Sequence, residues 1–265
     1  MDLGLKGKWA LITGASQGIG QAIARSLAKE GCNLHLAARN AEALKAGAAG
    51  LGSDYGVKVE IHPVDLTVRK AAAALAAECP DVDILVNNAG NTPRGSILEV
   101  DEETWRQGWE LKVYGYINLT REIYGRMLAR KSGVIVNVIG IGAERLEYAY
   151  AAGSAGNAAL VAFTRAIGGV SLDYGVRVMG VNPGWVETEK AKRTLRRRAL
   201  QERGSEELWR EMAVDMPRGS LIKPEEVADV VTFACSARSS AVSGTIFTVD
   251  AGFSARGYAP PRPAK

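Results

Sequence analysis

A glycine-rich turn between an apolar run and a helical pattern is the feature that most constrains the fold of this chain. The run Trp9–Thr13 is bulky or β-branched, which is typical of a strand buried on both faces. It leads into Gly14–Gly20 and then into Gln21–Gly31, where apolar residues recur at helical spacing and a glycine closes the pattern. A second apolar run follows at Asn33–Ala38. This order predicts a βαβ unit.

The spacing of the turn indicates a nucleotide ligand. Glycine lets the chain turn tightly, leaves no Cβ between the backbone and a phosphate, and directs the free amides of the helix N-terminus toward an anion. The glycines follow G-x-x-x-G-x-G rather than the commoner G-x-G-x-x-G, and the flanking strand and helix supply the context that such a motif needs.

The end of the second strand distinguishes between the two nicotinamide dinucleotides. An acidic side chain there binds the ribose 2′-OH of NAD, whereas an arginine favours the 2′-phosphate of NADP. Ala38 and Arg39 occupy this place, without a carboxylate. We therefore predict NADP as the cofactor, with NAD as the alternative.

Strands and helices alternate along the rest of the chain. The further expected strands cover residues 57–66, 82–90, 133–139, 176–181 and 245–250. The further expected helices cover residues 41–51, 67–79, 102–127, 157–174 and 225–236. The alternation predicts an α/β fold, a Rossmann-like doubly wound parallel sheet of about seven strands with helices on both faces. We expect one domain over residues 1–257 and a proline-rich, disordered tail at 258–265.

The composition narrows the setting of the protein. No apolar run approaches ~18 residues, so no membrane span is expected, and the N-terminal residues lack the order of a signal peptide. Cys32, Cys79 and Cys235 are scattered and lack metal-ligand spacing. His35 and His62 have no evident partners for a catalytic triad or a metal site. We expect a reducing, cytoplasmic setting and no metal.

Five motifs in a fixed order point to one family. They are TGxxxGIG at 13–20, Asp65 after the third strand, NNAG at 87–90, Pro183-Gly184 with Thr188, and VDAG at 249–252. Over nearly its whole length the sequence resembles the short-chain dehydrogenase/reductase family, classical type. The resemblance implies hydride transfer between a nicotinamide cofactor and a small ketone or alcohol, in a homodimer or homotetramer built on two long central helices.

The resemblance also implies which residues bind the cofactor. They come from the glycine-rich turn, the ends of the second and third strands, the NAG turn, the helix near residue 157 and the PG turn. These residues are Gly14, Ser16, Gln17, Gly18, Ile19, Gly20, Arg39, Asp65, Leu66, Asn88, Ala89, Gly90, Asn157, Pro183, Gly184, Val186 and Thr188.

The family's catalytic tetrad of asparagine, serine, tyrosine and lysine is absent at the aligned positions. In the family the tyrosine transfers the proton, the lysine lowers its pKa and holds the ribose, and the serine steadies the substrate oxygen. Alignment on 158–165 places Asn157 at the lysine position, Gly153 at the tyrosine position and Gly140 at the serine position. Lys112 stands at the asparagine position. Catalytic roles therefore do not transfer residue by residue.

Two interpretations of this site remain open. In the first, the protein is an NAD(P)-dependent oxidoreductase in which Lys112 supplies a cation and Tyr150 or Tyr148, or less directly Tyr114, supplies the phenol. A phenol with a pKa of about 10 needs a nearby cation to act near neutrality. In the second, the fold binds a dinucleotide without catalysis, as a sensor or partner-binding module. The lysine and the tyrosines also suit plain packing roles.

A basic segment follows the PG turn, where family members carry a helical lid, here at about 189–215. In one interpretation, its cations recruit an anionic substrate, such as a carboxylate or a coenzyme A ester. In the other, they form a solvated helix face and pair with the acidic residues that follow. No zinc or helix-turn-helix signature accompanies them, so no nucleic-acid partner is expected. The cations are Lys190, Lys192, Arg193, Arg196, Arg197, Arg198 and Arg203.

Overall fold

A single parallel sheet organises the computed structural model, which describes residues 1–214 and 216–256. Seven strands pair in the order β3-β2-β1-β4-β5-β6-β7. The predicted fold class is confirmed; the tail predicted at 258–265 lies outside the described residues. The strands are β1 (Trp9–Thr13), β2 (Asn33–Ala38), β3 (Val59–Pro63), β4 (Ile84–Asn87), β5 (Gly133–Val138), β6 (Val176–Pro183) and β7 (Ile246–Val249).

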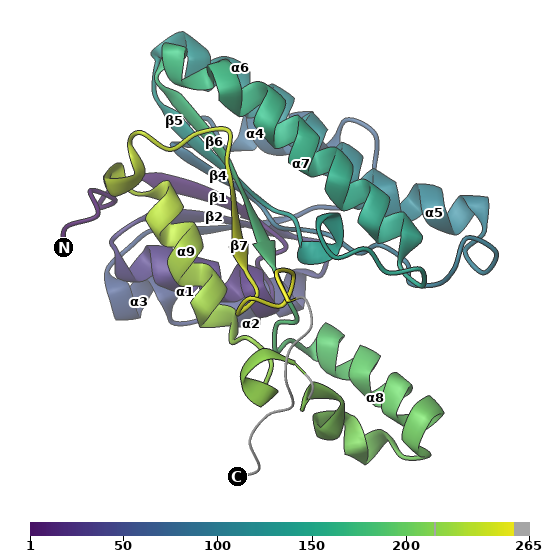
Figure 1. The fold of residues 1–265 in the computed structure, drawn as a ribbon. Helices are drawn as coiled ribbons and strands as arrows, with labels where there is room; N and C mark the ends of the chain where they lie inside the picture. The colour runs from purple at the N-terminus through teal and green to yellow at the C-terminus, as the bar shows by residue number, and fades with distance from the viewer. Residues whose placement is uncertain (215, 257–265) are drawn as a thin grey trace.

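Helices cover both faces of the sheet (Figure 1). One face carries α1 (Gly18–Lys29), α2 (Ala41–Ala48), α3 (Leu51–Tyr55) and α9 (Pro224–Cys235). The other carries α4 (Ala71–Glu78), α6 (Gly115–Arg130) and α7 (Ala151–Ser171). Every residue of β4 and β6 is buried, because the central strands are covered from both sides. The strands therefore hold their carboxyl ends rigidly at one edge, where ligands of such sheets bind.

The long helix predicted at 102–127 is interrupted. It consists of α5 (Glu102–Trp109), a π turn at Glu110–Tyr114 and α6. A π turn closes its hydrogen bonds one residue later than an α-turn, so it shifts the phase of the helix. As a result Leu111, Lys112 and Val113 are buried in succession, which a regular amphipathic helix does not achieve.

Several predicted helix bounds were wrong. α1 begins at Gly18 rather than 21, and the helix predicted at 41–51 is two helices, α2 and α3. α4 begins at Ala71 rather than 67, because Asp65 accepts hydrogen bonds from the Thr67 amide and hydroxyl and closes a turn ahead of the helix. α7 begins at Ala151 rather than 157. Glycines disfavour a helix when local propensity alone decides, yet close tertiary packing keeps this first turn helical.

α7 also bears on the membrane prediction. Among the described residues, Ala151–Tyr174 alone has the length and composition of a membrane-spanning helix. In this fold the helix packs along β6 as part of the layer that covers the sheet (Figure 1).

The lid segment forms a small subdomain beside the strand ends. α8 (Glu189–Arg203) begins at Thr188, whose hydroxyl accepts a hydrogen bond from the Ala191 amide (3.2 Å). A 3₁₀ segment at Glu206–Ala213 packs against α8 around its own apolar cluster, which includes Leu195 and Trp209. In Figure 1 α8 lies apart from the two helical layers.

The expectation that the two histidines lack partners was wrong. The β2–β3 register places His35 and His62 on the same face of the sheet, under α4. Their rings are hydrogen bonded, with His35 Nδ1 3.0 Å from His62 Nε2, and Cys79 at the end of α4 lies against His62. Sequence spacing does not reveal this cluster, because three separate elements build it.

Candidate active site

A cleft of about 650 Å³ lies at the carboxyl ends of the strands. It runs from the glycine-rich turn and the end of β2, past the NAG turn, to the start of α8. Its size is within the range of ligand sites in proteins. The predicted cofactor residues that line it are Gly14, Ser16, Gln17, Gly18, Ile19, Arg39, Leu66, Asn88, Ala89, Gly90, Pro183, Gly184 and Thr188.

The glycine-rich turn is held against the NAG turn. Gly14 has a φ of +66° and Gly18 a φ of +59°, which favour glycine. The Asn88 side chain donates to the carbonyls of Thr13 (2.9 Å) and Gly14 (3.2 Å). α1 starts at Gly18, so the amides of its first turn are free of partners within the helix and suit a phosphate.

Other predicted cofactor residues support the cleft without lining it. Gly20 packs beneath the turn, since an added Cβ would lie 2.3 Å from the Gly14 carbonyl oxygen. The Asp65 carboxylate is engaged with Thr67 beside the cleft. Val186 is buried and pairs with the strand-like segment at Ile222. These residues pack behind the lining of the cleft.

Arg39, predicted from the sequence to bind the 2′-phosphate, lies at the end of the cleft formed by β2. It is exposed at the end of β2, lines the cleft beside Ser16 and Asn40, and forms no ion pair with another described residue. Asn40 caps α2 by accepting a hydrogen bond from the Ala43 amide (2.9 Å). A solvated guanidinium without a carboxylate neighbour suits a 2′-phosphate.

Lys112 lies inside the protein and reaches the cleft. Its side chain is 7% exposed and crosses Gly90, where an added Cβ would lie 2.5 Å from Lys112 Cδ. Its Nζ donates to the Val138 carbonyl (2.8 Å) and the Tyr116 hydroxyl (2.9 Å). Burial, with a smaller contribution from the Lys190 ammonium, lowers the pKa of Lys112 from 10.5 to about 7.

Gly140 and Asn157, which the sequence alignment places at the family's serine and lysine positions, lie beside each other. Gly140 has a φ of +136°, a conformation in which a serine is strained. Beside it, Asn157 is buried, and its Nδ2 lies 3.1 Å from the place of an added Gly140 Cβ. The Asn157 Oδ1 has no hydrogen-bond partner among the described residues. A buried acceptor without a donor costs about 1–3 kcal/mol, so the site suits a ligand hydroxyl.

Tyr150 occupies the place of a side chain at position 153. A Cβ added to Gly153 would lie 2.0 Å from Tyr150 Cζ, so the phenol ring lies directly over Gly153. The Tyr150 hydroxyl is hydrogen bonded to Thr92 Oγ1 (2.6 Å), and the Arg94 guanidinium lies 4.7 Å from the ring centroid. Tyr150, Thr92 and Lys112 line the same cleft.

The structure thus separates the tyrosine candidates. Tyr148 is 75% exposed, Tyr114 is 46% exposed, and neither lines the cleft. Sequence reasoning missed Thr92 and Arg94, which follow the NAG turn by two and four residues. Their only signal was that position, because no motif marks them.

The lid cations divide into two groups. Lys190 and Arg193 line the cleft, and Lys190 Nζ donates to the Gly90 carbonyl (3.4 Å). Lys192 pairs instead with Glu187 and Glu189, and Arg198 pairs with Glu202. Part of the basic segment is therefore a paired surface, while two cations face the ligand cleft.

Known proteins share this architecture. The family described as enoyl-(acyl carrier protein) reductase matches residues 14–254. A galactitol 2-dehydrogenase (L-tagatose-forming) of Cereibacter sphaeroides is 35% identical over 251 residues, or 94% of this chain and 96% of that protein. A 3-oxoacyl-[acyl-carrier-protein] reductase of Aquifex aeolicus is 31% identical over 261 residues, 95% of this chain and 99% of that protein.

A solved structure agrees with these relatives. L-Sorbose reductase from Gluconobacter frateurii, complexed with NADPH and L-sorbose, matches with a TM-score of 0.89 at 32% identity, covering 96% of this chain and 98% of that one. The sheet order, the glycine-rich turn and the full-length matches lead to one conclusion. The chain belongs to the short-chain dehydrogenase/reductase family, classical type.

Proposed function

We propose that this protein is an NADP-dependent oxidoreductase that interconverts a carbonyl compound and an alcohol through a rearranged proton-transfer site. The Tyr150 ring carries the proposal, because it lines the cleft directly over Gly153, the residue aligned with the family's tyrosine. The dehydrogenase and reductase relatives, and the NADPH in one related structure, support the same chemistry.

The cleft offers a partner for each part of the cofactor. The turn at 14–20 would hold the pyrophosphate and Arg39 the 2′-phosphate. The Asn157 amide oxygen, which lies behind the cleft lining, would turn toward a ribose hydroxyl. NADPH supplies the hydride when it is bound. The orphaned acceptor of Asn157 and the bare backbone of the turn both fit such a ligand.

Tyr150 is the proposed proton donor. An oxygen that receives negative charge as its carbon is reduced needs a positioned acid. The Tyr150 O–H bond breaks, its proton passes to that oxygen, and the resulting phenolate later recovers a proton from water. The Thr92 hydroxyl, at 2.6 Å, orients the phenol, and the Arg94 guanidinium over the ring stabilises the phenolate.

Lys112 is proposed to provide the cation that the family draws from its lysine. Because its pKa is about 7, its charge changes near neutrality. The charged groups that share the cleft with it are Lys190, Arg193, Glu189 and Arg39. Loss of the Lys112 proton weakens stabilisation of the phenolate, so we expect reduction to slow as the pH rises above about 7.

The substrate is proposed to carry an anionic group as well as the carbonyl. Lys190 and Arg193 face the cleft and pair with no carboxylate among the described residues. Arg94, which pairs with Glu147, adds a third cation nearby. A carboxylate or coenzyme A ester on the substrate would meet the two lid cations as the lid contacts it.

Self-association and location complete the proposal. The outer face of α7 carries exposed small residues that allow close approach of a second copy. We propose a homodimer or homotetramer in a reducing, cytoplasmic setting, where the free thiols remain reduced. Light scattering measures the first expectation; a monomer at micromolar concentration would contradict it. The residues of this face are Ala155, Ala158, Ala159, Ala162, Ala166 and Gly169.

The test follows NADPH oxidation with a panel of ketones, 3-oxoacyl thioesters and ketoses, with and without carboxylates. Tyr150→Phe should lower kcat by about 10²–10⁴-fold while the Kd for NADPH stays unchanged. Tyr148→Phe, at the exposed neighbouring tyrosine, is the matched control and should keep full activity. Equal activity in both variants removes Tyr150 from the mechanism. Tight NADPH binding without turnover of any substrate favours the alternative, a dinucleotide-binding sensor.

A further inference from the structure

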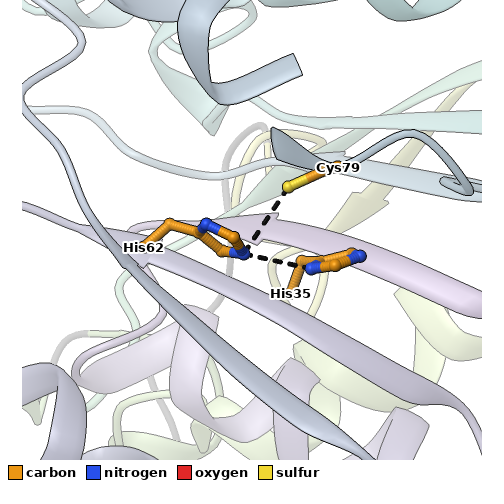
Figure 2. A group of neighbouring side chains, drawn as sticks. All are labelled: His35, His62 and Cys79. Carbon is orange, nitrogen blue, oxygen red and sulfur yellow. Dashed lines mark hydrogen bonds between the residues drawn. The ribbon is translucent and has the colours of Figure 1, made fainter. Parts of the chain in front are cut away.

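Three side chains outside the cleft converge under α4 (Figure 2). His35 comes from β2, His62 from the neighbouring edge strand β3, and Cys79 from the residue that follows α4. Their donor atoms all lie within 4.8 Å of one another. Figure 2 shows His62 Nε2 pointing at both His35 Nδ1 and Cys79 Sγ. No step of the proposed reaction uses these residues.

We propose that His35, His62 and Cys79 bind one zinc ion. Tetrahedral Zn²⁺ takes nitrogen at about 2.0–2.1 Å and sulfur at about 2.3 Å, which places neighbouring ligand atoms about 3.3–3.6 Å apart. His35 Nδ1 and His62 Nε2 are 3.0 Å apart, and Cys79 Sγ lies 3.6 Å from His62 Nε2. The second separation matches an edge of such a tetrahedron and the first is about 0.3 Å shorter than one. His35 Nδ1 and Cys79 Sγ lie within 4.8 Å of each other, so rotation of the side chains is needed to bring all three donors to one ion.

Surrounding groups orient the donors as metal sites require. Glu78 Oε2 lies 3.0 Å from His62 Nδ1, so the carboxylate accepts the Nδ1 proton and leaves the Nε2 lone pair facing the other two donors. Trp9 stacks on the His35 ring, with centroids 4.4 Å apart, and fixes its plane. A carboxylate, a histidine and a metal position in line are the usual outer arrangement of a zinc ligand.

A fourth ligand is at hand. Glu60 pairs with His35 in the β2–β3 register, and its Oε2 lies 3.4 Å from His35 Nδ1. Its carboxylate can complete the coordination or leave that position to water. Two neutral imidazoles, one thiolate and one carboxylate suit zinc rather than magnesium or calcium, which prefer oxygen. Binding releases the Cys79 thiol proton to solvent.

The three donor side chains are largely shielded from solvent. His35 is 3% exposed, Cys79 is fully buried, and the His62 side chain is 10% exposed. The Glu60 and Glu78 side chains beside the cluster are 55% and 64% exposed, so an ion can enter from their side. The ion would tie the edge strand β3 and the end of α4 to β2. β2 itself ends in Ala37 and Ala38, which line the ligand cleft.

The test uses the full-length protein, treated with a chelator under reducing conditions and titrated with Co²⁺ and then Zn²⁺. One equivalent of Co²⁺ should give the visible absorption of a tetrahedral site and a near-ultraviolet sulfur-to-cobalt band, and Zn²⁺ should displace it. Cys79→Ala should remove the sulfur band and weaken binding at least tenfold. Cys32→Ala is the matched control, because the buried Cys32 thiol donates a hydrogen bond to the Leu5 carbonyl. This variant should bind Co²⁺ and Zn²⁺ as the wild type does.

A substitution at an exposed side chain tests the site with little risk of misfolding. The Glu78 side chain is 64% exposed, so Glu78→Gln should fold normally, and loss of an outer-shell carboxylate should weaken metal affinity about 10–100-fold. Circular dichroism and NADPH binding check each variant separately from the metal. The proposal is overturned if the wild type takes up no stoichiometric Co²⁺ or Zn²⁺, or if Cys79→Ala binds Co²⁺ as tightly as Cys32→Ala does.

Discussion

Replacing Lys112 with methionine should stabilise the protein most at low pH. The ammonium is buried without a carboxylate partner among the described residues. Its removal leaves no orphaned acceptor, because the Tyr116 hydroxyl still donates to the Val138 carbonyl (2.8 Å). Methionine matches the length of the lysine stem, so the packing against Gly90 is kept.

The pKa of Lys112 sets the size of the effect. It falls from 10.5 in the unfolded chain to about 7 in the fold. Each pKa unit corresponds to about 1.4 kcal/mol, so the whole shift corresponds to about 5 kcal/mol. Because the folded pKa is the lower one, the unfolded state binds more protons between pH 7 and 10.5, and stability rises with pH across that window. From pH 6 to pH 9 the wild type should gain about 3 kcal/mol from this residue.

Urea denaturation of both proteins at pH 6, 7, 8 and 9 measures the effect. Every other titrating group is common to the two proteins, so the difference in free energy of unfolding isolates Lys112. The advantage of Lys112→Met over the wild type should shrink by about 3 kcal/mol from pH 6 to pH 9. Lys29→Met, at an exposed helix position, is the control. A difference that stays constant with pH refutes the buried, cationic description of Lys112.

Three other substitutions test separate parts of the structure. Gly153→Ala should lower kcat at least tenfold without changing NADPH affinity, because the methyl group displaces the Tyr150 ring. Gly125→Ala, in open space on α6, is the control. Equal kcat in the two variants would contradict the packing of Tyr150 over Gly153. Arg39→Ala should raise the Kd for NADPH about tenfold and leave NADH unchanged in titrations, since only the 2′-phosphate is lost; an equal change for both cofactors would exclude this contact. Arg177→Met should lower the free energy of unfolding by about 3–5 kcal/mol, since the buried guanidinium donates to four carbonyls in the last turn of α9 and just after it; a loss below 1 kcal/mol in urea would show those carbonyls to be satisfied otherwise.

Much of the fold follows from local sequence patterns. The apolar runs at Trp9–Thr13 and Asn33–Ala38 became strands with the predicted bounds, because a buried parallel strand needs an almost continuous apolar segment. The glycine-rich turn and the NAG turn came together at the cleft, because parallel strands bring their carboxyl ends to one edge. These features depend on residues that are neighbours in sequence or on a general rule of topology.

Other features depend on packing that no local pattern records. The π turn at Glu110–Tyr114 adds one residue to a single helical repeat. The apolar spacing on either side of Lys112 is that of an ordinary α-helix, so the sequence pattern does not reveal the extra residue. The position of the Tyr150 ring over Gly153 depends on where the preceding loop joins α7. The contact between His35 and His62 depends on strand register, and Cys79 joins them only because α4 ends above that face.

Tyr150 stands just ahead of the first turn of α7, at the end of the loop from β5. A tyrosine at position 153 would be held by the rigid backbone of α7. Tyr150 is instead held by the loop that precedes α7. Changes in the length or sequence of residues 141–149 should therefore move the hydroxyl of Tyr150, the proposed acid, while α7 stays intact. Evolution of new specificities and laboratory redesign can both start from that stretch.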